Sequence, residues 1–134
     1  MISKTFISVI IVIMTLAVLY SCSKDETPTT TTTPTNQAPN SPSNPIPADG
    51  ALNVSRFVVL SWTCTDPNSG DTLWFDVFAG TANPPVHVVA TNTLANSVDI
   101  GLMAAHTTLY WKVTAKDNNN AFTEGPVWSF TTGN

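Results

Sequence analysis

Charged side chains, cysteine and histidine are all scarce in this sequence. Only 10% of its 134 residues are charged, five basic against nine acidic, which gives a net charge of −4 at pH 7. Proteins that bind nucleic acids need clustered Lys and Arg to displace phosphate counterions, so that class is excluded. Two Cys and two His leave little material for a metal site or a nucleophilic triad. We therefore expect no enzyme, no metal, no cofactor and no small-molecule substrate.

The first 21 residues have the pattern of a secretory signal peptide. Lys4 supplies the positive start, and residues 6–20 are almost wholly apolar. As a helix this run would span roughly 22 Å, less than the ~30 Å of a bilayer's hydrocarbon core. A short apolar run followed by a small residue favours a cleaved signal peptide. The alternative is a short membrane anchor that is not cleaved.

The sequence Leu19-Tyr20-Ser21-Cys22 ends this segment. It resembles the lipobox of bacterial lipoproteins, with Tyr20 bulkier than the usual residue at its position. The resemblance implies cleavage after Ser21 and acylation of the Cys22 thiol and new amine. Each buried acyl CH₂ contributes ~0.8 kcal/mol, so two or three chains would anchor the protein stably in the membrane.

Lys24, Asp25 and Glu26 follow the lipobox almost directly. A Lys followed by acidic residues at this place resembles the surface-export signal of lipoproteins in certain Gram-negative bacteria. The resemblance implies a lipid-anchored protein of the outer membrane, exposed at the cell surface. The alternative is that these residues only solvate the chain next to the membrane.

A Thr- and Pro-rich linker follows, over residues 27–44. Repeated Thr, interspersed Pro and low hydrophobicity prevent a packed core, so we expect an extended tether that is a candidate for O-glycosylation. The expected organisation is a signal peptide at 1–21, the lipidated Cys, export signal and linker at 22–44, and one domain at 45–134.

From Pro45 onward, apolar residues recur at every second position. Short alternating segments separated by Gly, Pro, Asn and Asp predict an antiparallel β-sandwich. Cys64 shares the inward phase of Trp62, and we expect it to be buried as a small apolar residue. The expected core consists of nine large inward-facing residues: Leu60, Trp62, Phe75, Val77, Leu109, Trp111, Val113, Trp128 and Phe130.

The order of these segments resembles that of a fibronectin type III domain. The resemblance rests on the Pro-rich residues 45–50, Leu60-Ser61-Trp62, and residues 76–80, 109–113 and 125–132. It implies an all-β fold, a seven-strand antiparallel, immunoglobulin-like β-sandwich with strands C, C′, F and G in one sheet. Leu109 stands where this family usually carries a corner tyrosine.

Three aromatic residues fall on the outward phase of their segments: Trp74, Phe78 and Tyr110. If their strands are neighbours, these rings form one exposed patch flanked by Asp76 and Lys112. Aromatic faces suit sugar rings or protein partners, so the three are candidate partner-binding residues. The alternatives are that another segment covers them or that they only support cross-strand pairing.

Two further groups of residues carry side chains that could form a site. Residues 66–71 offer oxygen ligands of the kind that Ca²⁺ takes, but they are ordinary turn formers and no bidentate Glu follows. His87 and His106 have no motif neighbour that would make a base–nucleophile pair. The sequence therefore predicts a lipid-anchored surface protein whose module binds a protein or glycan without catalysis. The alternative is a structural accessory lipoprotein of the envelope with no ligand of its own.

Overall fold

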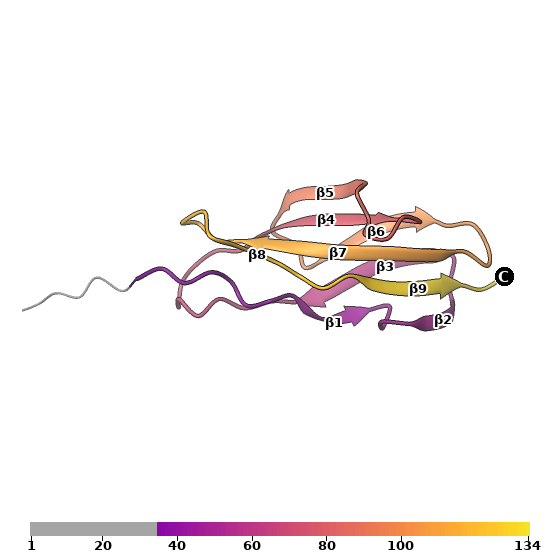
Figure 1. The fold of residues 1–134 in the computed structure, drawn as a ribbon, viewed down its shortest axis with the longest axis horizontal. Coiled ribbons are helices and arrows are strands. Elements are labelled where there is room, and N and C mark those ends of the chain that lie inside the picture. The colour runs from indigo at the N-terminus through magenta and orange to yellow at the C-terminus, as the bar shows by residue number, and fades with distance from the viewer. Residues whose placement is uncertain (1–34) are drawn as a thin grey trace, which may run out of the picture. The chain divides into compact units, whose positions relative to one another are not determined.

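β-Strands are the only regular elements in residues 35–134, the part of the chain that the computed structural model describes (Figure 1). In chain order they are β1 (Ser43–Ile46), β2 (Ala51–Val54), β3 (Phe57–Thr63), β4 (Trp74–Gly80), β5 (Val88–Thr93), β6 (Ser97–Leu102), β7 (Thr108–Lys116), β8 (Phe122–Glu124) and β9 (Trp128–Thr132). No helix within this range is long and apolar enough to span a bilayer.

The expected signal peptide and anchor lie outside the described residues. This applies to the cleavage position Ser21, the lipidation site Cys22 and the export residues Lys24, Asp25 and Glu26. Those assignments stay predictions.

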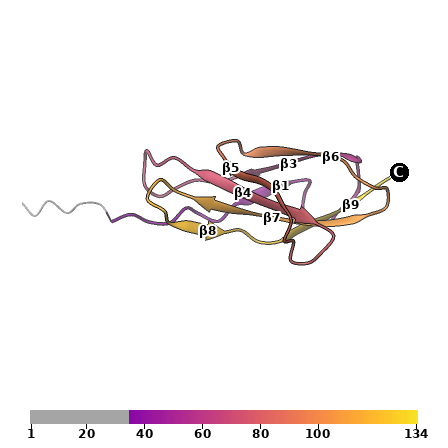
Figure 2. The ribbon, with the colours of Figure 1, turned by 90° about the horizontal axis from the view of Figure 1, so that it is seen from above.

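The strands form two sheets. β1, β3 and β6 make a three-stranded antiparallel sheet, and the second sheet has the order β2-β9-β7-β4-β5, with β8 paired to β7. Figures 1 and 2 both show β4 and β7 running side by side. An all-β sandwich is the predicted class. The described residues hold nine strands, however, and the parallel β2–β9 pair makes the second sheet mixed, unlike the expected seven-strand antiparallel layout.

Two short strands account for the difference. Between Ile46 and Ala51 the chain crosses from the first sheet to the second, through a turn where Gly50 adopts a φ of 74°, and so β2 forms. β8 and β9 are separate because Pro126 lies between them and has no N–H to donate to a ladder.

The apolar core lies between the sheets. All nine residues expected there are buried, because the strand alternation directs them to the same side, and this prediction is confirmed. Aromatic rings dominate the packing. The Trp62 and Phe75 centroids are 5.3 Å apart in an edge-to-face arrangement, and those of Trp111 and Trp128 are 4.7 Å apart. Val58, Ala79 and Ala115 complete the buried cluster.

The domain begins earlier than the expected boundary at Pro45. Pro39 and Pro42 are buried, and β1 already begins at Ser43. The Asn40 N–H donates to the Thr65 carbonyl at 2.9 Å, and the Thr123 hydroxyl donates to the Pro39 carbonyl at 2.6 Å. These partners are distant in sequence, so a composition typical of a linker conceals an ordered edge of the domain.

Candidate binding surface

The β4–β7 register defines the outer face of the second sheet. Trp74 lies opposite Lys116, Phe78 opposite Lys112, and Gly80 opposite Tyr110. Opposed residues of antiparallel strands point to the same side, so the three candidate aromatics share this face. All three side chains are partly exposed.

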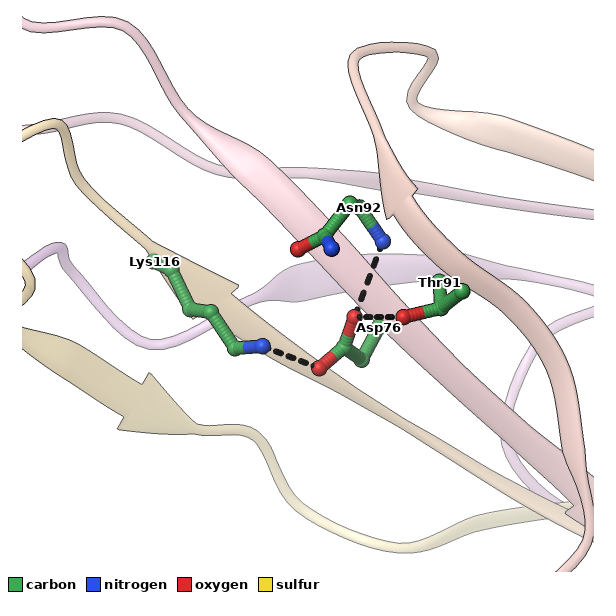
Figure 3. Close-up of polar contacts among 4 residues, drawn as sticks. All are labelled: Asp76, Thr91, Asn92 and Lys116. Carbon is green, nitrogen blue, oxygen red and sulfur yellow. Dashed lines mark hydrogen bonds and ion pairs between the residues drawn. The ribbon is translucent and has the colours of Figure 1, made fainter.

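An ion pair separates Trp74 from Phe78 on this face. The Asp76 carboxylate pairs with the Lys116 ammonium and accepts hydrogen bonds from the Thr91 hydroxyl and the Asn92 N–H, both at 2.9 Å (Figure 3). Burial alone would raise the pKa of Asp76, but Lys116 and the two donors outweigh it and hold the pKa below its ordinary value. Asp76 is therefore ionised at neutral pH, and its negative charge neutralises Lys116.

A second ion pair covers Phe78. The Lys112 ammonium pairs with Glu124 and lies 5.2 Å from the centroid of the Phe78 ring. Tyr110 lies two residues before Lys112 and pairs across the sheet with Ser129 of β9. The outer face thus has two parts. We call Phe78, Lys112 and Tyr110 the Tyr110 end.

The opposite part of the face, the Trp74 end, is defined by Trp74, Lys116 and Phe122. Phe122 of β8 is the register partner of Lys116, so the three side chains form a row across β4, β7 and β8. Phe122 is 66% exposed. A hollow of about 380 Å³ lies here, and Asn92 and Asn120 also line it.

Sequence reasoning missed Phe122. It follows a polar Asn-rich turn and precedes a Gly-Pro pair, so its three-residue strand leaves no recognisable alternation. The available signal was a large aromatic residue in an otherwise polar turn region.

Asp117 fixes the turn between β7 and β8. It is only 4% exposed, and its carboxylate accepts hydrogen bonds from the Asn36 amide at 2.7 Å and from the N–H groups of Asn119 and Ala121 at 2.8 Å. Burial would raise the pKa of Asp117, but these three donors hold it below its ordinary value. A buried carboxylate therefore anchors this turn.

Three carboxylates converge beside this turn. Oxygens of Asp66, Asp71 and Asp117 lie within 4.8 Å of one another, and the Asn119 amide donates to Asp71 at 3.2 Å. Asp117 comes from a separate loop, so residues 66–71 taken alone did not reveal the cluster. Acidic groups gather in this way without an ion as well, and the expected absence of a metal stays a prediction.

Cys64 is only half-buried, unlike the buried position expected for it. β3 ends at Thr63, and Cys64 just beyond it packs against the core without being fully covered. Its thiol donates to the Asn40 carbonyl at 3.1 Å. Burial raises the pKa of the Cys64 thiol, the nearby Asp66 adds to this, and a backbone hydrogen bond at Thr65 offsets part of it.

The two histidines have different surroundings. His87 is exposed just before β5, and His106 Nε2 lies 2.8 Å from the Asn134 side-chain oxygen. In the described residues no hydrogen bond joins the two rings.

Comparisons with known proteins give information on the fold of this chain and not on its function. No protein-family model matches the chain, and no curated protein matches it. Among solved structures, it is similar to an alpha-L-rhamnosidase from Dictyoglumus thermophilum, with 16% identity and a TM-score of 0.57 over 74% of this chain and 13% of that one. An alpha-L-rhamnosidase from Streptomyces avermitilis, complexed with L-rhamnose, matches with 14% identity and a TM-score of 0.48 over 72% and 10% of the two chains.

The chain thus spans only a small part of the length of these enzymes. At such low identity, the likeness to the first enzyme extends to the fold alone. The fold and the outer face together define a small all-β sandwich domain. Its second sheet carries partly exposed aromatic side chains on the outer face.

Proposed function

We propose that this protein is a lipid-anchored surface lipoprotein whose single fibronectin type III-like domain binds a protein or glycan partner without catalysis. The observation that carries the proposal is the outer face of the second sheet. Trp74, Phe78 and Tyr110 remain partly exposed there, although the other side of the same strands forms the core. Partly exposed aromatic side chains grouped on one face are typical of contact sites.

The strand pairing supports the fibronectin type III-like assignment. β5, β4, β7 and β9 lie in one sheet in that order, as expected for strands C′, C, F and G, while β1, β3 and β6 form the other sheet. In the described residues, no His pairs with a nucleophile.

Lipid anchoring and export rest on the resemblances at Ser21-Cys22 and at residues 24–26. A fatty acid with an alkyne tag, fed to bacteria producing the chain, should label the wild type and not Cys22→Ala. Protease added to whole cells should degrade the wild type and spare a variant in which Lys24, Asp25 and Glu26 are all Ala. Equal labelling, or equal protease sensitivity, would contradict the corresponding part of the proposal.

The binding role is tested on the outer face. In a screen of glycans and envelope proteins, the combined Trp74→Ala and Tyr110→Ala variant should lose the partner that the wild type retains. Phe57→Ala is the matched control, because Phe57 is 74% exposed and belongs to the other sheet. Full retention of the partner by the double variant, with its fold intact by circular dichroism, rules out this face.

An accessory envelope lipoprotein without a ligand is the second candidate. Exposed apolar residues on the first sheet favour it. Phe57 and Leu102 are register partners, exposed by 74% and 56%, and Val59 beside them is 53% exposed. A face of this kind suits permanent packing against a neighbouring protein. In that case Phe57→Ala, and not the double variant, would release the protein from its complex.

A further inference from the structure

We propose that the hollow at the Trp74 end is a binding site for neutral saccharides. The inference rests on the proposed role as a binding module, and it adds both the place and the chemical class of the ligand. Three properties of the hollow carry it: its aromatic walls, its uncommitted amides and its charged side chains, which already have partners.

Two aromatic rings flank the hollow. Trp74 and Phe122 stand on either side of Lys116, in a row set by the register of β4, β7 and β8. Phe122 contributes nothing to the buried core and remains 66% exposed. The apolar face of a sugar ring packs well on such aromatic surfaces, while its hydroxyls stay free for polar contacts.

Side-chain amides supply the polar contacts. In the described part of the chain, the amides of Asn92 and Asn120 make no hydrogen bond to another residue. Figure 3 shows the Asn92 amide outside the hydrogen bonds that hold Asp76. Asn118 accepts one hydrogen bond from the Thr72 N–H at 3.0 Å and keeps its NH₂ group uncommitted. An amide both donates and accepts, as a sugar hydroxyl does.

The two charged side chains that line the hollow, Lys116 and Asp117, already have partners. The Lys116 ammonium pairs with Asp76, and the Asp117 carboxylate accepts hydrogen bonds from three donors. An anionic ligand would compete with Asp76 for Lys116, and a cationic one would have to displace the donors of Asp117. A neutral polyhydroxy ligand leaves both arrangements undisturbed.

The hollow is also preformed. Asp117 holds the turn that carries Asn118 and Asn120, so these amides need little further ordering when a ligand binds. Its volume of about 380 Å³ falls within the range of small-molecule sites, ~300–1,000 Å³.

A larger hollow of about 740 Å³ lies beneath the β3–β4 connection and is a weaker candidate. Its only aromatic side chain is Phe75, which is 5% exposed and belongs to the core. It therefore presents no ring face for stacking.

The test uses the full chain, purified in detergent micelles, on an array of neutral polysaccharides (glucans, mannans, galactans and xylans) with alginate and hyaluronan as anionic comparisons. The wild type should bind at least one neutral polysaccharide. Phe122→Ala should weaken that binding about tenfold or more, as for an aromatic hot spot. Asn120→Gly should also weaken it, because glycine accepts the φ of 69° and removes only the amide.

Leu52→Ala is the control, because Leu52 of β2 is 72% exposed and does not line the hollow, and its affinity should stay within about twofold of the wild type. Tryptophan fluorescence gives a second readout. Of the four tryptophans only Trp74 is not buried, so the bound polysaccharide should protect its emission from acrylamide quenching.

Three results would overturn the saccharide site: no neutral polysaccharide binds, only the anionic ones bind, or Phe122→Ala binds as the wild type does. If a protein partner depends on Tyr110 instead, the saccharide site is wrong and the binding-module proposal survives. If no partner of either kind depends on Trp74 or Tyr110, the binding module itself fails.

Discussion

The two faces of β4 and β7 are built from the same strands and differ in burial. On the inner face, Phe75 and Val77 of β4 pack with Trp111 of β7 and are nearly or fully buried. On the outer face, Trp74 and Asp76 belong to the same strand and stay partly exposed. Because side chains alternate between the faces, a residue in one row can change with little effect on the next. The arrangement separates the buried core from the face that we propose for recognition.

Trp111→Ala, on the inner face, should lower the free energy of unfolding most. Trp111 is fully buried and contacts both Trp62 and Trp128, so its removal leaves a cavity between the sheets. We expect a loss of about 3–5 kcal/mol in the free energy of unfolding, measured by urea denaturation with circular dichroism. A loss below about 1 kcal/mol would mean that the core is not as the structure has it.

Gly125→Ala should have the second largest effect, a loss of about 1–3 kcal/mol in the free energy of unfolding. A Cβ at Gly125 would lie 2.9 Å from the Val113 carbonyl oxygen and 3.2 Å from Pro42 Cβ. Gly80→Ala is the control, since a Cβ there meets nothing within 4 Å. Equal stability of the two variants would show that Gly125 does not approach the Val113 carbonyl and Pro42 as closely as the structure has it.

Asp76→Asn should destabilise the protein less, and the size of the destabilisation should depend on pH. The folded-state pKa of Asp76 lies below its ordinary value of 3.8, so the ionised carboxylate stabilises the fold above that pH. This contribution is lost as the pH falls through the folded-state pKa. Exposed ion pairs contribute about 0.2–1 kcal/mol, so we expect a modestly lower Tm than the wild type at pH 7 and a smaller difference at an acidic pH below the ordinary value of 3.8. A Tm difference of the same size at both pH values would exclude the ion pair as its source.

Phe122→Ala should change stability least. The side chain is 66% exposed and outside the core, so the free energy of unfolding should stay within about 0.5 kcal/mol of the wild type. Urea denaturation of Phe122→Ala and Trp111→Ala under the same conditions compares the two faces directly. Destabilisation approaching that of Trp111→Ala would place Phe122 in the folding core and remove the distinction.

Much of the fold could be predicted because its signal is local. Alternation of polar and apolar residues identified the buried rows of β3, β4, β7 and β9, including Trp62 and Trp111. Where alternation stops, prediction weakened: Cys64 lies one residue beyond the end of β3 and is only half-buried.

The remaining features depend on partners far apart in the sequence. Thr123 binds the Pro39 carbonyl across 84 residues, which is why a linker-like composition concealed the start of the domain. The parallel β2–β9 pairing joins Ala51 to Phe130 in the same way. In the candidate site, too, one aromatic residue could be predicted from local sequence and the other could not. Trp74 was found from its outward phase, whereas Phe122 joins it only through the pairing of β8 with β7.

The affinity of Phe122→Ala for a neutral polysaccharide that the wild type binds is the most direct test of a recognition surface separate from the core. The account predicts binding about tenfold weaker or more, with an unchanged free energy of unfolding. Unchanged affinity, or affinity lost only because the fold is lost, would contradict it.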